Sequence, residues 1–372
     1  MAKVRLGEVA RECKSTVKDS TGLPIVGLEH LIPGQIELTQ WSENTDNTFT
    51  KGFKKGQVLF GRRRAYQKKA AIAPFDGICS GDITVIEALP DRILPELLPF
   101  IIQNDSLFDY AVEKSAGSLS PRVKWEHLKN YEFVLPDLKQ QQKLVDLLWA
   151  MTRTKKAYQT LIKKTDELVK SQFIEMFGDP ELQHDGLTTL GEHIDIINGF
   201  AFKGELFGDT GLPVIKIGNV NRSDFKKGSM QFYEYDSALS RFVIFPGDIL
   251  ISLTGTVGKD DFGNICMVVG DYDKYYLNQR NAKIVLHDEL VPKYLIHLLR
   301  SDYIRRKLIQ SGTGVRQCHL HNKDLEGIRF LLPGRESQEL FATFIQQSDK
   351  SKFELKQAIS RIDEMIKALM KA

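Results

Sequence analysis

The sequence predicts an α+β protein in which two homologous α/β domains are separated by a long antiparallel two-helix coiled coil. Its 372 residues exceed what one hydrophobic core usually holds. The chain also repeats itself almost from end to end, and each copy changes from short β-like runs to a long segment with helical periodicity. These observations predict a domain, a helix, a second domain and a second helix, at residues 1–136, 137–178, 179–333 and 334–372.

The duplication appears when the sequence is compared with itself at an offset of 197 residues. FVLP at 133–136 then meets FLLP at 330–333, and Gln141 meets Gln338. Insertions reduce the offset in the N-terminal part of each copy. The matched segments there are LGE at 6–8 with LGE at 190–192, GLPIV at 22–26 with GLPVI at 211–215, and KGQVLF at 55–60 with PGDILI at 246–251. Because the matches keep one order over nearly the whole chain, we interpret them as a duplicated domain.

The first part of each copy has the short apolar runs and turn residues that are typical of strands. We expect a helix after each group of strands, at 94–103 and at 291–309, so both globular parts are predicted to be mixed α/β domains. The expected strands are VLFG at 58–61, DITVIEA at 82–88, DILISL at 248–253 and AKIVLH at 282–287.

The second part of each copy runs for more than 30 residues without Gly or Pro and has the heptad pattern of a coiled coil. If both domains dock their helices alike, the two helices pair antiparallel; the alternative is that each helix packs only on its own domain. Polar members of the stripes leave room for helices of a partner. The recurring positions are Leu144, Leu147, Met151, Thr154, Tyr158, Leu161, Thr165 and Leu168, and then Phe341, Phe344, Ser348, Ser351, Leu355, Ala358, Ile362 and Met365.

The composition is that of an ordinary globular protein, with 42% hydrophobic and 27% charged residues. No apolar run approaches the roughly 20 residues that span a bilayer, and the N-terminal residues lack the apolar core of a signal peptide. The four cysteines are scattered, which favours reduced thiols. These features predict a cytoplasmic protein.

The motifs that resemble catalytic sites are incomplete. TGTVGKD at 254–260 lacks the glycine spacing and the hydroxyl of a phosphate loop, and CHLH at 318–321 has no second ligand cluster. Asp82 and Glu87 suggest a nuclease pair, but the second copy has Arg280 where the first has Asp82. We therefore expect no catalysis, no metal and no cofactor in this chain; an enzyme with an unrecognised site is the alternative.

A basic stretch without acidic residues lies between Asp46 and Asp76. Unpaired like charges repel one another unless a partner neutralises them, so the stretch favours a surface that binds a polyanion. A solvated loop is the alternative. The cations are Lys51, Lys54, Lys55, Arg62, Arg63, Arg64, Lys68 and Lys69.

Several polar loops carry the residue types that contact DNA, and they recur in both copies. Arginine and glutamine read base edges, lysine pairs with phosphate, and small hydroxyl residues allow close approach of the backbone. Each loop taken alone has an ordinary polar loop as its alternative. The candidates in the first copy are Arg62, Arg63, Arg64, Tyr66, Gln67, Lys68, Lys69, Ser118, Arg122 and Lys124; those in the second are Thr254, Thr256, Lys259, Gln279, Arg280, Asn281, Thr313, Arg316 and Gln317.

The duplicated layout resembles the specificity subunit of type I restriction-modification systems. The resemblance is carried by GLPIV and GLPVI, by PGDILISLTGTVG at 246–258, by the SGTG loop at 311–314, and by the change from a proline-ended apolar run to a Gln-rich long helix. NGFAFK at 198–203 is similar to the start of a target-recognition domain, which adds Lys203 to the candidate DNA contacts. GRRRAYQKK at 61–69 departs from the GTxG pattern of the second copy.

The resemblance implies that each domain reads one half of an asymmetric, bipartite site in double-stranded DNA and that the helices set the gap. It also implies two modification subunits that methylate adenine with S-adenosylmethionine, and ATP-dependent restriction subunits. The partly polar helix pair is the expected docking site for these partners, through the apolar members of its heptad stripes. A non-catalytic scaffold with two peptide- or subunit-binding heads is the alternative.

Overall fold

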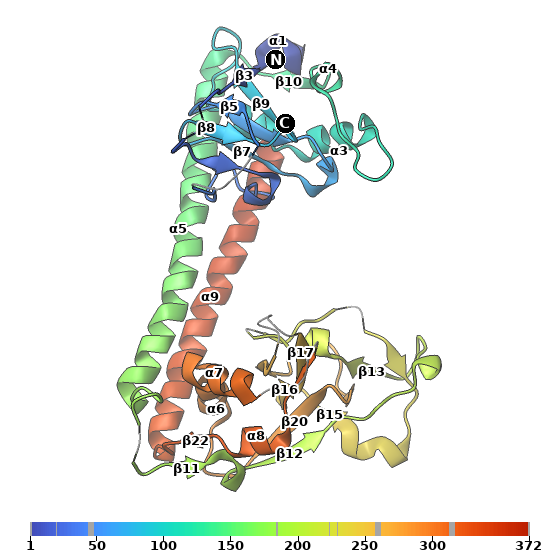
Figure 1. Ribbon diagram of the computed structural model, residues 1–372, viewed down its shortest axis with the longest axis vertical. Helices are drawn as coiled ribbons and strands as arrows, with labels where there is room; N and C mark the ends of the chain where they lie inside the picture. Colours follow the sequence, from blue (N-terminus) through green and yellow to red (C-terminus); the bar gives the residue numbers. More distant parts are fainter. Residues whose placement is uncertain are drawn as a thin grey trace. The chain divides into compact units, whose positions relative to one another are not determined.

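The computed structural model describes residues 2–19, 21–43, 48–183, 185–222, 224–228, 230–256, 262–311 and 317–370. The chain divides into two compact units, of which one combines residues 1–161 with 354–372 and the other is residues 162–353. Each unit contains one α/β domain and part of both long helices, α5 (Leu138–Phe177) and α9 (Arg335–Leu369), green and red in Figure 1. The predicted fold class is confirmed.

In the described part of the first unit, the strands form two four-stranded sheets and one two-stranded sheet. The two larger sheets have the orders β2 (Ala10–Glu12), β9 (Ile83–Ala88), β6 (Val58–Gly61), β7 (Ala70–Ile72) and β3 (Ser15–Thr16), β5 (Lys51–Phe53), β8 (Gly77–Cys79), β4 (Ile25–Val26). The remaining elements are the pair β1 (Ala2–Arg5) and β10 (Glu132–Leu135), and the helices α1 (Leu6–Val9), α2 (Leu98–Ile102), α3 (Asp105–Glu113) and α4 (Trp125–Leu128).

The described strands of the second unit form two four-stranded sheets and two short pairs. The sheet orders are β12 (Ile194–Asn198), β20 (Asn281–Leu286), β16 (Ile249–Ser252), β18 (Ile265–Met267) and β14 (Phe232–Tyr233), β13 (Leu212–Ile215), β19 (Tyr275–Leu277), β15 (Val243–Ile244). The pairs are β11 (Thr188–Thr189) with β22 (Arg329–Phe330) and β17 (Thr254–Thr256) with β21 (Gln317–His319), and the short helices are α6 (Pro292–Arg300), α7 (Asp302–Ser311) and α8 (Asn322–Glu326).

Strand pairing confirms the duplication. The segments GLPIV and GLPVI contribute β4 and β13, and each is parallel to the strand beside it, β8 and β19 respectively. The order β2-β9-β6-β7 in the first unit matches β12-β20-β16-β18 in the second. Four predicted strands are found as β6, β9, β16 and β20. The two predicted short helices differ from expectation, because the first begins only at Leu98 and Ser301 divides the second into α6 and α7.

A buried glutamine fixes the start of each long helix to its own domain. In the first unit the Gln141 side chain accepts a hydrogen bond from Leu94 N at 2.9 Å and donates one to Pro136 O at 2.9 Å. In the second unit Gln338 accepts from Val291 N at 2.9 Å and donates to Pro333 O at 2.9 Å. Because a buried amide group must be satisfied inside the protein, this repeated arrangement explains why both junctions carry Gln after the proline-ended run.

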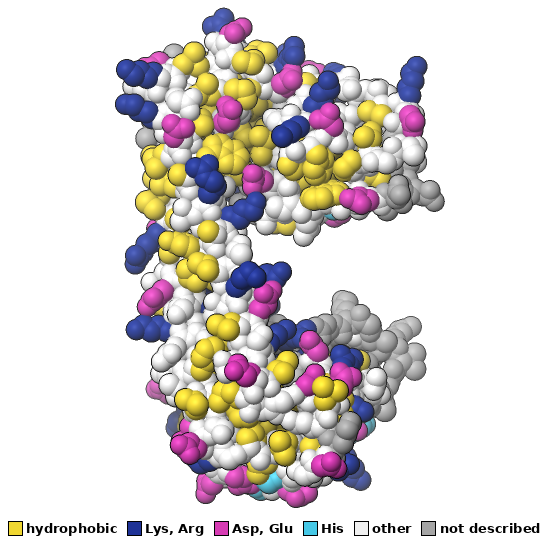
Figure 2. All heavy atoms as spheres, turned by 90° about the vertical axis from the view of Figure 1, so that its left-hand side faces the viewer, with side chains coloured by type: hydrophobic (Ala, Val, Ile, Leu, Met, Phe, Trp, Pro, Cys, Tyr) yellow, Lys and Arg dark blue, Asp and Glu magenta, His cyan; other side chains and the backbone are white. Residues whose placement is uncertain are grey.

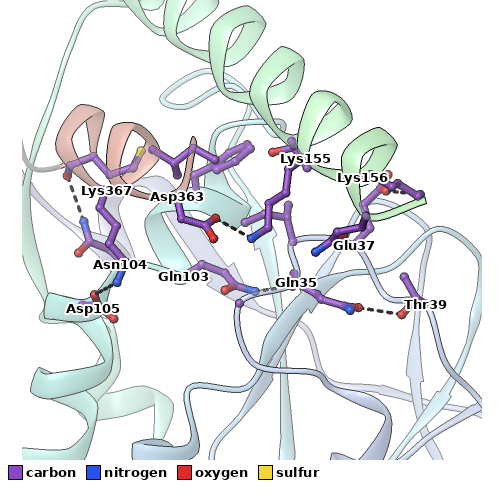
Figure 3. A pocket seen from close by; sticks show the side chains of 17 residues that line it. Gln35, Glu37, Thr39, Gln103, Asn104, Asp105, Lys155, Lys156, Asp363 and Lys367 are labelled. Atoms are coloured by element: carbon purple, nitrogen blue, oxygen red, sulfur yellow. Dashed lines mark hydrogen bonds and ion pairs between the residues drawn. The ribbon is translucent and has the colours of Figure 1, made fainter. Parts of the chain in front are cut away.

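The end of each long helix also packs into a domain core of the same unit. In the second unit, Phe173 and Phe177 of α5 contact Tyr294 and Phe341, with ring centroids 4.9–5.7 Å apart. In the first unit, Ile366 and Leu369 of α9 pack against the domain core, and the end of the helix also borders a cavity of about 360 Å³ (Figure 3). Lys367 Nζ lies 3.1 Å from Asp105 Oδ2 at the edge of this cavity.

The two ion pairs between the helices show that α5 and α9 run antiparallel, because the partner in α9 moves from 363 back to 352 as the position in α5 advances from 155 to 166. Lys155 Nζ lies 2.6 Å from Asp363 Oδ1 in the first unit, and Lys352 Nζ lies 3.0 Å from Asp166 Oδ1 in the second. The 197-residue offset relates the two lysines to each other and the two aspartates to each other. The predicted antiparallel pairing is therefore confirmed, and the two copies make equivalent contacts.

The predicted heptad stripe of α5 is only partly correct. Val145, Leu148, Val169 and Phe173, which are not in the stripe, are buried in the domain cores. Of the predicted positions, Leu144, Met151, Tyr158 and Thr165 are half-buried, whereas Leu147, Leu161 and Leu168 are 44%, 50% and 53% exposed. Lysine at position 155 supplies its aliphatic stem to the seam while its ammonium group pairs with Asp363, so an apolar heptad count skips it. The prediction for α9 is correct at Phe341, Ser348 and Ile362 but not at Met365, which is 46% exposed.

Candidate nucleic-acid interface

The structure brings together the two polar loops predicted in the first domain. The segment 62–64 follows β6, and it lies beside the segment 120–123 that precedes α4. Arg64 N donates a hydrogen bond to Pro121 O at 2.8 Å, Val123 N donates to Arg62 O at 3.0 Å, and Arg63 bridges to Arg122. The candidates Arg62, Arg63, Arg64, Tyr66, Ser118, Arg122 and Lys124 therefore belong to one surface, which we call the arginine loop pair (residues 62–67 and 115–124).

Asp82 organises two arginines of this surface. Its carboxylate accepts hydrogen bonds from Arg122 Nε at 2.7 Å and Arg122 Nη2 at 3.3 Å, and from Arg63 Nη1 at 3.3 Å. Arg63 Nη2 also donates to Ser120 Oγ at 3.0 Å. The hydrogen bonds and positive charge of Arg122, together with those of Arg63, lower the pKa of Asp82, so the carboxylate stays ionised at neutral pH.

Arg62 and Arg64 are the arginines of this surface whose guanidinium groups have no partner among the described residues. Among the described residues, neither guanidinium makes a hydrogen bond or ion pair, and the Nε atoms of both are buried without an acceptor. Arg64 also holds the left-handed backbone conformation, with φ of 54°, which is unusual for a residue with a side chain. Both side chains are half-buried, and no acid of the described residues neutralises their charge, so these two groups are suited to an external anion. Tyr66 beside them is 56% exposed.

Three cations of the basic stretch are instead held within the chain. Lys68 Nζ lies 2.7 Å from Asp105 Oδ1, Lys69 Nζ donates to Leu28 O at 2.7 Å, and Lys51 Nζ donates to Ile83 O at 2.8 Å. Lys68 and Lys69 therefore have contacts within the chain, as Arg63 and Arg122 do, and their contact with DNA remains a proposal. The stretch contains no acidic residue, but the fold places acidic side chains and carbonyl groups from other segments beside it. Its unpaired positive charge is therefore smaller than the sequence suggests.

The second domain has the same backbone frame with different side chains. Leu320 N donates to Leu253 O at 2.8 Å, as Val123 N does to Arg62 O, and Leu253 N donates to Arg280 O at 2.8 Å, as Arg62 N does to Asp82 O. The pairing of Thr254 with His319 likewise corresponds to that of Arg63 with Arg122. Three positions of one frame thus carry Arg63, Asp82 and Arg122 in the first domain and Thr254, Arg280 and His319 in the second.

The remaining candidates in the second domain have different outcomes. Gln279 and Arg280 are exposed, and Phe200 O accepts from Gln279 N at 3.0 Å, which brings the loop that contains exposed Lys203 to the same surface. Thr256 is exposed, whereas Thr254 Oγ1 is buried and has no hydrogen-bond partner among the residues that the structure describes. Asn281 is 0% exposed in β20, so its prediction as a DNA contact is wrong: the alternation of the strand turns it into the domain. Lys259, Thr313 and Arg316 lie outside the described residues, and for Gln317 only the backbone is described.

Asp82 and Ser120 lie on this candidate surface but were not among the predicted DNA contacts. The sequence had suggested Asp82 only as half of a nuclease carboxylate pair. The contrast with Arg280 at the matched position was the available signal. In the part of the chain that the structure describes, no group of three His, Cys, Asp or Glu residues is placed to hold a metal ion, and no helix is long and apolar enough to cross a membrane.

Comparison with protein families gives a match over both copies. The model of the type I restriction modification DNA specificity domain matches residues 1–165 and 187–362. A curated relative, the type I restriction enzyme MjaVIII specificity subunit of Methanocaldococcus jannaschii, is 23% identical over 256 residues. That alignment covers 63% of this chain and 59% of the relative, so it spans less than two thirds of the relative's length.

Solved structures share the fold. A chain from a structure on complex assembly and conformational transition of the type I R-M system has a TM-score of 0.60 at 20% identity, covering 99% of this chain and 96% of that chain. The type I restriction-modification system S subunit from M. genitalium has a TM-score of 0.56 at 14% identity, covering 100% and 96% respectively. At these identities the likeness concerns the fold alone.

Proposed function

Because this chain belongs to the family of type I restriction modification DNA specificity domains, we propose that it is the sequence-reading subunit of a type I restriction-modification complex. Each domain reads one half of a bipartite, asymmetric site in double-stranded DNA. The chain itself carries out no catalysis; modification subunits methylate adenine and ATP-dependent restriction subunits cleave DNA at its direction.

The observation that carries this proposal is the shared frame with divergent side chains. If this surface were needed for folding, its side chains would stay the same after duplication. Two domains that bind different DNA sequences instead keep the backbone conformation and change the side chains exposed on it. Arg63, Asp82 and Arg122 against Thr254, Arg280 and His319 follow the second pattern. Arginine and histidine side chains supply the hydrogen-bond donors that base edges and phosphates accept.

Selection of bound sequences from a random DNA pool by the full chain, followed by footprinting, tests the proposal. We expect two short protected segments of different sequence, separated by unspecific base pairs. A single continuous palindrome would contradict divided reading. Binding of no DNA at low salt would instead favour a protein-interaction scaffold.

Replacing the two unpartnered arginines should weaken DNA binding in a salt-dependent way. Each phosphate contact removed lowers the slope of log K against log salt by about 0.9. We therefore expect Arg62→Gln with Arg64→Gln to lower affinity and reduce the slope by about one to two, measured by fluorescence anisotropy at several salt concentrations. The control is Lys54→Gln with Lys55→Gln, which removes two exposed cations from another turn of the same basic stretch. Equal effects of the two double variants would mean that general charge, not the loop, provides binding.

The exposed apolar residues of the long helices are the proposed docking sites for modification subunits. Figure 2 shows hydrophobic side chains exposed along the helices among charged ones. Leu168 and Met365 are equivalent under the 197-residue offset and are 53% and 46% exposed. Equivalent patches on the two copies suit two identical partners, which would cover them with helices of their own. Leu147 and Leu161 extend the surface, whereas half-buried Leu144, Met151, Tyr158, Phe344 and Leu355 border it and the buried Phe341 and Ile362 are no longer assigned to partner contact.

Charged substitutions on this surface should prevent assembly without unfolding the chain. Leu161→Glu with Leu168→Glu places two charges where an apolar contact is expected, so we expect at least a ten-fold loss of affinity for the modification subunit in calorimetry. Leu182→Glu, at a 75% exposed leucine outside both helices, is the matched control. Normal assembly of the double variant would remove this face from the interface.

A further inference from the structure

We infer that Asp82 is a positioning residue that sets the sequence preference of the first domain by holding Arg63 and Arg122 in fixed orientations. This inference rests on the proposed function and names a residue that determines specificity at one half-site. The carboxylate lies between both guanidinium groups, at 2.7 Å from Arg122 Nε and 3.3 Å from Arg63 Nη1.

The contacts with Asp82 leave part of each guanidinium unused. A guanidinium carries five N–H donors in a rigid plane. Arg122 uses one N–H of Nε and one of Nη2 toward Asp82, which leaves three. Arg63 uses one N–H of Nη1 toward Asp82 and one of Nη2 toward Ser120, and its Nε is buried, which leaves one N–H on each terminal nitrogen. The side chains of Arg122 and Arg63 are still 43% and 37% exposed, compared with 18% for Asp82. The acid is thus largely covered, and the two forks are presented to solvent.

Fixed forks favour recognition of particular bases over general attraction to DNA. A free arginine has many rotamers, and it must lose that freedom when it binds a base edge bidentately. Here the protein has already restricted it. A carboxylate also repels phosphate, so its presence among arginines weakens non-specific binding. Both effects increase the difference in affinity between the correct DNA sequence and other sequences, and neither increases the affinity for random DNA.

The second copy shows that folding does not require a carboxylate at this position. Asp82 O accepts from Arg62 N at 2.9 Å, and Arg280 O accepts from Leu253 N at 2.8 Å. The backbone role is therefore the same in both domains while the side chain changes from acid to base. Arg280 is exposed. The side chain at this position can therefore differ between the domains, because the hydrogen bond that they share uses only the backbone oxygen.

Asp82→Asn in the full-length chain tests the inference. Once the unaltered chain has selected its site, affinities are measured for that site, for versions with either half scrambled, and for random DNA. We expect discrimination at one half-site to fall by about ten-fold, as for loss of a good bidentate contact. Discrimination at the other half-site should be unchanged, and affinity for random DNA should be equal or higher.

Asp76→Asn is the control for charge, because Asp76 is an exposed acid of the same domain that accepts only from Lys55 N among the described residues. Arg122→Lys keeps charge but loses the fork, so it should reproduce the effect of Asp82→Asn and replaces that variant if it unfolds. Equal behaviour of the Asp82 and Asp76 variants, or equal losses at both half-sites, would overturn the inference. A parent chain that selects no sequence would overturn the proposed function itself.

Discussion

A chain with seven extra residues in both long helices should reject its original DNA site and select one whose halves lie about three base pairs farther apart. Duplicating residues 152–158 and 349–355 adds about 10.5 Å to each helix at 1.5 Å per residue. One base pair occupies about 3.4 Å of a duplex. Under the proposal that the helices act as the spacer, the gap between half-sites follows their length.

The paired duplication is needed because of the ion pairs between the helices. It leaves Lys155 opposite Asp363 and Lys352 opposite Asp166, since each pair lies wholly on one side of the inserted segments. Duplicating residues 152–158 alone moves one pair out of register by two turns. We expect that control to lose stability and to gain no new preferred gap. Selection from DNA with random gap lengths provides the measurement, and an unchanged preference in the paired variant would exclude the helices as the ruler.

The fold could be predicted because residues that hold the domain and its helix together recur at equivalent positions in both copies of the duplicated sequence. Gln141 and Gln338 are aligned in the two copies, and the structure gives them equivalent hydrogen bonds: each accepts from one backbone N–H, of Leu94 or Val291, and donates to the carbonyl of the proline before its helix. Strand alternation and proline-ended runs are local signals, so β6, β9, β16 and β20 were within reach of sequence reasoning.

The phase of α5 and the role of the cations depended on contacts distant in sequence. Lys155 belongs to the helix seam only because Asp363 lies opposite it, 208 residues later. Lys68 is held by Asp105, and Asp82 by Arg122, across 37 and 40 residues. From the sequence, charged side chains are expected at the surface. Only the fold shows which of them form ion pairs within the chain. The sequence therefore predicted that the two loops belong together, as the structure shows, but not which of their charged side chains are paired within the chain.

Removing the junction glutamines should have the largest effect on stability. Gln141 and Gln338 are 1% and 0% exposed, and each satisfies one backbone N–H and two carbonyls. Leucine of similar size would leave these groups buried without partners, at about 1–3 kcal/mol for each unsatisfied group. We expect Gln141→Leu and Gln338→Leu each to lower the free energy of unfolding of their unit by about 3 kcal/mol, which corresponds to a fall in Tm of roughly 6–12 °C.

Tryptophan fluorescence separates the two effects, because all three tryptophans, Trp41, Trp125 and Trp149, belong to the first unit. Gln141→Leu should shift the fluorescence transition, whereas Gln338→Leu should shift circular dichroism with a smaller change in fluorescence. Gln142→Leu is the matched control: this neighbouring glutamine is exposed and bonds only to Asp146 among the described residues, so its loss should cost less than about 0.5 kcal/mol. If Gln141→Leu were as mild as Gln142→Leu, the glutamine would not be what fastens the long helix to its domain, and its recurrence at both junctions would need another cause.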